Sequence, residues 1–123
     1  MKNAASYFSI PAEDFERAKK FYESLYDQKF QIMEDNGDTM LMLPGDLEHG
    51  GVAGAITKGP NRKPSREGTL VYLNFEGDLQ KILDRAKEAG ATIDTPKTAI
   101  PDMGFYGIII DSEGNRVGLW SAE

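Results

Sequence analysis

The sequence predicts an α+β protein built from two modules of the order β-α-β-β-β. A strand-like segment containing Tyr7 leads into a helical pattern that begins at Asp14, and a second segment containing Tyr72 leads into another that begins at Asp78. Further strand-like segments follow each helical pattern, and one proline- and glycine-rich stretch, 58–68, separates the halves. Two repeated modules have to pack together, and the groove between them is the natural place for a ligand.

The length of the chain favours one domain. A chain of 123 residues can bury a hydrophobic core without stabilisation by disulfide bonds or metal ions. Its content of 40% hydrophobic and 28% charged residues is ordinary for a globular protein. We therefore expect one domain over 1–123, with module one at about 1–57, a linker at 58–68 and module two at about 69–123.

The charge and the absence of cysteine exclude several function classes. A net charge of −6 argues against nucleic-acid and anionic-membrane partners, because such polyanions would be repelled. No cysteine is present, which excludes disulfides, thiolate nucleophiles and thiolate metal sites. The first residues contain no apolar leader segment, and no run approaches membrane-spanning length. We expect a cytoplasmic protein.

Module one is predicted to begin with a strand at 5–10. Pro11 should end this strand, because proline lacks the N–H that a β-ladder needs. Asp14 is placed to cap the following helix. The apolar face of that helix recurs with a period of 3.6 residues and consists of Phe15, Ala18, Phe21, Tyr22, Leu25 and Tyr26.

Three strands should complete module one, at 29–34, 39–43 and 51–57. Asn36-Gly37 is the predicted turn between the first two of them, because both residues accept a positive φ.

Module two repeats the order. A strand at 69–75 precedes a helix capped by Asp78, and Gly90 should end that helix in the left-handed conformation. The apolar face of the helix consists of Leu79, Ile82, Leu83, Ala86 and Ala89. The remaining strands are predicted at 92–100, 105–110 and 116–121, with a turn at 111–115.

Three stretches carry a family resemblance. They are 14–22 (DFERAKKFY), 86–91 (AKEAGA) and 111–120 (DSEGNRVGLW), the last close to a D-P-x-G-N turn that leads into a closing strand. As an ordered set they resemble the vicinal oxygen chelate (VOC) superfamily, the group of glyoxalase I, bleomycin-resistance proteins and extradiol ring-cleaving dioxygenases. Tyr26-Asp27 departs from the usual aromatic-glycine pair, a small change because Asp tolerates the left-handed conformation.

The resemblance implies the architecture and the assembly. It implies a curved, mostly antiparallel eight-stranded sheet, helices on its convex side, a cavity on its concave side, and a homodimer. Whether the modules close on each other within one chain or swap between chains is left open by the sequence.

Strand alternation assigns side chains to the concave face. Phe8 and Ile10 should face the helices, as should Leu73 in the equivalent strand of module two. The side chains that we expect to contact a ligand are Tyr7, Ser9, Tyr72, Asn74, Arg116 and Trp120. Either Met40 and Met42 or Leu41 and Leu43 should line the same face. Alternatively, the aromatic side chains only fill the space between half-sheets or cover a dimer contact.

The resemblance also implies where a metal ion would be held. Carried over to this chain, the ligand positions of metal-dependent relatives fall near Ala5, Gly54, Leu70 and Gly118. None of these can replace the imidazole and carboxylate ligands that Zn, Ni or Fe need, and a shift by one residue reaches only Ser6 or Thr69. We expect no metal and no cofactor, which disfavours metal-dependent glyoxalase I and extradiol dioxygenase activities.

Other candidate groups each have two interpretations. His49, the one histidine, and Tyr72 are candidate acid–base groups, or His49 is simply an exposed loop residue. The loop bases Lys58, Arg62, Lys63 and Arg66 either attract an anionic ligand or belong to a solvated linker. Asp111 and Asn115 have the properties of a hairpin turn rather than of a site.

The function predicted from the sequence is that of a metal-independent small-molecule binding protein of the bleomycin-resistance type. The first alternative is a glyoxalase-like lyase or isomerase that uses Tyr, Arg or His groups. The second is a non-catalytic structural or interaction module whose cavity is closed by its own side chains.

Overall fold

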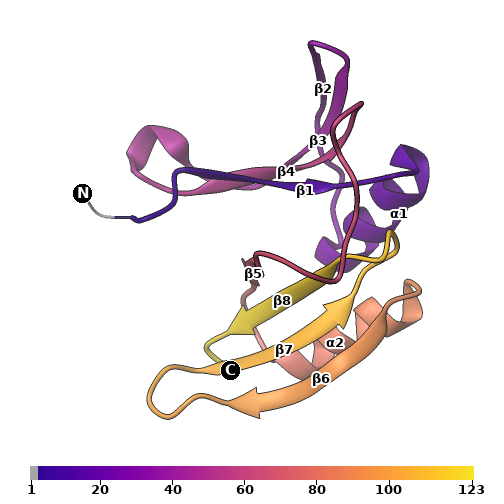
Figure 1. Cartoon of the computed structure of the whole chain (residues 1–123). Coiled ribbons are helices and arrows are strands. Elements are labelled where there is room, and N and C mark those ends of the chain that lie inside the picture. Colours follow the sequence, from indigo (N-terminus) through magenta and orange to yellow (C-terminus); the bar gives the residue numbers. More distant parts are fainter. Residues whose placement is uncertain (1–2) are drawn as a thin grey trace.

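The two predicted modules form in sequence order (Figure 1). The computed structural model describes residues 3–123. Module one contains β1 (Tyr7–Pro11), α1 (Phe15–Tyr26), β2 (Ile32–Asp35), β3 (Asp38–Leu43), the 3-10 turn η1 (Leu47–His49) and β4 (Ala53–Lys58). Module two contains β5 (Tyr72–Asn74), α2 (Leu79–Glu88), β6 (Thr92–Ala99), β7 (Phe105–Ile110) and β8 (Arg116–Ser121). The α+β class and the repeated β-α-β-β-β order are confirmed.

The strands of the described residues are divided between two four-stranded sheets, in the orders β1-β4-β3-β2 and β5-β8-β7-β6. In each sheet the first and last strands of the module pair in parallel, and the other neighbours pair antiparallel. The mostly antiparallel pairing is as predicted, but the eight strands form two hydrogen-bonded sheets rather than one continuous ladder. β1 and β5 are therefore edge strands.

The helices pack together and cover one face of the sheets. α1 contacts α2 and β4, and α2 contacts β6, β7 and β8. Figure 1 shows both helices on the same side of the molecule. We call the face of each sheet that is turned away from the helices its open face; it corresponds to the predicted concave face.

The predicted caps and turns form where their side chains and backbone allow them. Asp14 accepts a hydrogen bond from the backbone N–H of Arg17, and Asp78 accepts one from that of Gln80. Gly90 follows α2 with a φ of 109°, a conformation that glycine adopts without strain. β1 ends at Pro11, one residue later than predicted, because the pairing with β4 continues past the proline: the backbone N–H of Ala12 donates to the carbonyl of Thr57 at 2.8 Å.

One hydrophobic core joins the two modules. It includes Leu25 of α1 and Leu79 of α2, and the rings of Tyr26 and Phe75 meet with centroids 4.7 Å apart. Leu41 and Leu43 of β3 are buried in this core. Since side chains alternate along a strand, Met40 and Met42 occupy the open face, which decides the register that the sequence left undetermined.

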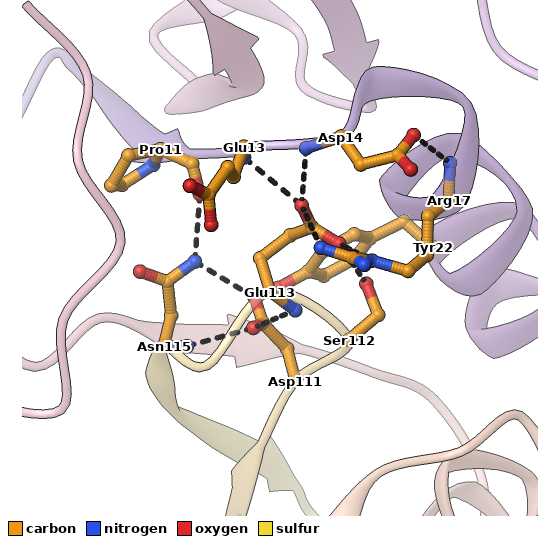
Figure 2. A network of polar contacts seen from close by, with 9 residues as sticks. All are labelled: Pro11, Glu13, Asp14, Arg17, Tyr22, Asp111, Ser112, Glu113 and Asn115. Atoms are coloured by element: carbon orange, nitrogen blue, oxygen red, sulfur yellow. Dashed lines mark hydrogen bonds and ion pairs between the residues drawn. The ribbon is translucent and has the colours of Figure 1, made fainter.

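A group of polar side chains also joins the modules, and we call it the inter-module polar cluster (Figure 2). Its members are Arg17, Tyr22, Asp111, Glu113 and Asn115. Glu113 Oε1 accepts hydrogen bonds from the backbone N–H groups of Glu13 and Asp14, at 2.9 and 2.7 Å, at the start of α1. Arg17 Nε donates to Glu113 Oε2 at 2.7 Å. The turn of module two thus stabilises the first turn of the helix of module one.

The residues of the turn at 111–115 also make hydrogen bonds that the sequence did not predict. Asp111 Oδ1 accepts from the backbone N–H groups of Glu113 and Asn115, as a hairpin turn requires. However, Asp111 Oδ2 also accepts from Tyr22 Oη at 2.6 Å, and Asn115 Nδ2 donates to the carbonyl of Pro11 at 2.7 Å. The interpretation of Asp111 and Asn115 as turn residues only was therefore incomplete, because their remaining polar atoms bind module one.

Candidate functional site

The open faces of the two sheets present equivalent pairs of side chains. Tyr7 and Ser9 lie opposite Ala53 and Ala55 of β4. Tyr72 and Asn74 lie opposite Gly118 and Trp120 of β8 in the same parallel pairing. The two tyrosines are partly exposed, at 44% for Tyr7 and 48% for Tyr72. Each module therefore offers one aromatic ring and one polar group at matching positions.

Tyr72 belongs to an aromatic surface on β5, β7 and β8. Its ring lies across Gly118, so closely that a Cβ at this position would overlap the ring. It also meets the ring of Tyr106 edge-on, with centroids 6.2 Å apart. Trp120 lies on the same face, and its Nε1 donates to the carbonyl of Met103 at 2.8 Å. Tyr106 was missed from the sequence, although the alternation of β7 could have indicated it.

Two cavities lie between the modules. Cavity one has a volume of about 350 Å³ and is lined by residues that include Phe8, Ser9, Lys63, Glu67, Arg116 and Val117. Cavity two has a volume of about 500 Å³ and is lined by residues that include Phe8, Tyr26, Leu43, Tyr72 and Asn74. Both volumes are in the range of small-molecule sites. The side chain of Phe8 borders both cavities.

The predicted ligand-contacting residues do not share one cavity. Ser9 and Arg116 line cavity one, and Tyr72 and Asn74 line cavity two. Tyr7 and Trp120 line neither of them.

Ser9 is part of a polar chain on the open face of module one. Its Oγ donates to Thr57 Oγ1 at 3.1 Å and accepts from Arg62 Nη1 at 3.3 Å. Arg62 Nη2 in turn donates to Asp38 Oδ2 at 3.1 Å. The linker that follows β4 therefore folds back onto the sheet, and Arg62 is not a freely solvated linker residue.

Arg116 begins β8 and lies on the open face of module two. Its Nε donates to Asp94 Oδ2 at 2.9 Å, and the two side chains are 38% and 42% exposed. This bond occupies one of the five N–H donors of a guanidinium group, so others can reach a ligand.

His49 lies apart from both cavities. Its Nδ1 is 2.7 Å from Asp46 Oδ2 within the loop that contains η1, and the two side chains are 77% and 64% exposed. The aspartate fixes one ring nitrogen and leaves the other toward solvent, an arrangement that allows acid–base chemistry only if a substrate is brought to this loop.

The positions considered for a metal ion have different environments. Gly54 pairs with Phe8 and Leu43 on the core side of β4, so it does not lie on the open face. Gly118 lies beneath the ring of Tyr72, while Ala5 and Leu70 precede the strands. Among residues 3–123, no three His, Asp or Glu side chains are grouped closely enough to hold a metal ion. Metal independence stays a prediction from the sequence.

In the described part of the chain, none of the helices has the length and apolar character needed to cross a membrane.

Solved structures of similar fold cover nearly the whole chain. A glyoxalase-related enzyme from Fulvimarina pelagi has a TM-score of 0.68 at 13% identity, and the match covers 98% of this chain and 88% of that one. TnmS3, an antibiotic binding protein from Streptomyces sp. CB03234, has a TM-score of 0.63 at 24% identity, covering 100% and 99%. A glyoxalase/bleomycin resistance protein/dioxygenase family enzyme from Burkholderia phytofirmans PsJN has a TM-score of 0.65 at 16% identity, covering 96% and 98%.

The family assignment comes from a sequence profile. No curated protein matches the chain significantly. The profile of the Glyoxalase/Bleomycin resistance protein/Dioxygenase superfamily, in contrast, matches residues 4–119, almost the entire chain. The chain therefore belongs to this superfamily, as the ordered motifs predicted.

Proposed function

We propose that this protein binds a small organic molecule on the open faces of its two sheets, without a metal ion. The observation that carries this proposal is the matched pair of partly exposed tyrosines, Tyr7 and Tyr72, each beside a polar side chain. A tyrosine ring offers a large apolar surface and a polar tip, which suits contact with an aromatic or heterocyclic ligand. The fold shared with an antibiotic binding protein supports a binding role.

The proposed binding unit is a homodimer. Within one chain the six predicted residues are distributed over two cavities and the exposed surface. A second copy that places its open face against this one would bring the aromatic side chains of one module over those of the other. Sedimentation velocity tests the assembly: a dimer at micromolar concentration supports it, and a monomer at all concentrations contradicts it.

A ligand panel tests the binding function. Aromatic and heterocyclic compounds that bind the folded protein should raise its melting temperature in a concentration-dependent way. Tyr72→Ala should abolish the shift, because it removes the ring that borders cavity two. Leu47→Ala is the matched control, since Leu47 is similarly exposed, at 55%, and lines neither cavity. If no compound shifts the melting temperature, the function is that of a structural or interaction module.

A second candidate function is a lyase or isomerase activity, favoured by the 2.7 Å contact between His49 and Asp46. The compounds of the panel should then give new products by mass spectrometry, and His49→Ala should stop their formation. Products that form equally with the His49→Ala protein would exclude His49 as the acid–base group.

A further inference from the structure

The linker forms one wall of cavity one, and hydrogen bonds hold it in place. The backbone N–H of Ser65 donates to Asn115 Oδ1 at 3.1 Å, and the carbonyl of Ser65 accepts from the backbone N–H of Arg116 at 3.4 Å. Asn115, which is buried, also donates to the carbonyl of Pro11 at the end of β1. One asparagine thus fixes the linker to both modules, so the cavity is formed before a ligand arrives.

The walls of cavity one suit an apolar body of modest size. Its apolar lining includes Phe8 and Ile10 of β1 and Val71 and Val117 of module two. The volume of about 350 Å³ accommodates a bicyclic aromatic compound.

The charged groups at cavity one favour a negative group on that body. Lys63 lines the cavity and takes part in none of the ion pairs found among residues 3–123. Arg116 also lines it and binds Asp94 through Nε, which leaves its terminal N–H groups available. Glu67 is the opposing charge in the lining. Arg62, in contrast, binds Ser9 and Asp38 and does not line this cavity.

We propose that cavity one binds a small organic monoanion, a carboxylate on an apolar body, and that the carboxylate lies beside Lys63 and Arg116. This inference goes beyond the proposed function, because neither Tyr7 nor Tyr72 lines cavity one. It also assigns a role to the linker: Lys63 selects the anionic ligand, since the protein as a whole carries a charge of −6 and would repel it elsewhere.

The test compares a charged probe with its neutral isostere. Titration calorimetry of the full chain is carried out with 2-naphthoate and with 2-naphthamide, which share the ring system and differ in charge. The wild-type protein should bind naphthoate more tightly. Lys63→Gln should weaken naphthoate binding about three- to tenfold and leave naphthamide binding unchanged, the range for loss of one partly solvated charge contact.

Two further variants distinguish a direct contact between Lys63 and the carboxylate from the electrostatic field of the protein as a whole. Arg66→Gln removes the same charge from the same linker at a residue that does not line cavity one, and it should change naphthoate binding less than twofold. Glu67→Gln removes the opposing charge and should strengthen naphthoate binding. Melting temperatures of the unliganded variants verify that each one folds.

The outcomes distinguish this inference from the proposed function. Equal affinity for the two probes, or equal loss in the Lys63→Gln and Arg66→Gln variants, overturns the assignment of a carboxylate to Lys63 while small-molecule binding stands. If neither these probes nor any compound of the thermal-shift panel binds, the proposed function fails and the inference with it.

Discussion

At the scale of single residues, the Tyr22 hydroxyl is a buried polar group that joins the two modules. It donates to Asp111 Oδ2 at 2.6 Å, and both side chains are buried. Burial, together with the negative charge of Asp111, raises the pKa of Tyr22 well above its ordinary value, so the hydroxyl stays protonated as a donor.

Tyr22→Phe should therefore destabilise the fold. The change leaves Asp111 Oδ2 with Asn115 Nδ2 as its donor in the cluster, at 3.0 Å. We expect the free energy of unfolding to fall by about 1–3 kcal/mol, the usual cost of an under-satisfied buried acceptor. Urea denaturation measures it. Tyr26→Phe is the control, because Tyr26 lies on the same helix and burial alone, with no hydrogen-bond partner among residues 3–123, acts on its hydroxyl; a loss as large as that of Tyr22→Phe would contradict the assignment.

Glu113 makes stability depend on pH. Burial alone would raise the pKa of its carboxyl group, but the hydrogen bonds from Arg17 and from the backbone of Asp14 hold that pKa below the ordinary 4.5. The folded protein thus binds this proton less tightly than the unfolded chain. The stability that Glu113 contributes is fully present above pH 4.5 and is lost as the pH falls through the lower folded pKa.

Glu113→Gln should remove this pH dependence. At neutral pH the variant should be less stable than the wild type by about 2 kcal/mol, the scale of hydrogen bonds to a charged group. The difference should narrow below pH 4.5, where the wild type loses its own contribution. Urea denaturation across the acidic range measures both curves, and Glu76→Gln makes the same chemical change on an exposed side chain. A constant difference at every pH would rule out the carboxylate as its source.

At the scale of elements, the sequence predicted those limits of helices and strands that nearby turn and capping residues determine. The limits of β7 and β8 were predicted to the residue, because a turn-forming segment lies between two apolar alternating runs. β5 is shorter than its predicted segment, at three residues, since it pairs only with β8 at the edge of its sheet. The contact of Glu113 with α1 joins residues about a hundred positions apart, and nothing in the sequence near either one indicates it.

The packing of β5 on β8 depends on Gly118. A Cβ at this position would overlap the ring of Tyr72, so Gly118→Ala should displace the ring and cost about 1–3 kcal/mol, as overpacking does. In a Tyr72→Ala background the same substitution should cost almost nothing. Urea denaturation of the four proteins of this double-mutant cycle measures the coupling, and an equal cost in both backgrounds would show that the ring is not the obstacle.

At the scale of the whole molecule, the sequence predicted which side chains share one face of a sheet, but not how the two sheets are placed relative to each other. Alternation assigned Tyr7, Ser9, Tyr72 and Asn74 to matching positions, which the pairing of β1 with β4 and of β5 with β8 reproduces. It could not indicate that Ser9 and Asn74 border different cavities. That depends on the angle between two sheets, which long-range core contacts set.

The shared core and the inter-module polar cluster imply that the modules unfold together. Trp120, the single tryptophan, reports on module two by fluorescence, while far-ultraviolet circular dichroism reports on both modules. The two signals should give one urea midpoint. Leu25→Ala, in the fully buried face of α1, should lower the free energy of unfolding by about 2–5 kcal/mol. It should also lower the Trp120 midpoint as much as the dichroism midpoint, although the substitution lies in module one. A Trp120 midpoint that does not move would mean that module two is stable without module one, and that the contacts between Tyr22, Asp111 and Glu113 position the modules without coupling their folding.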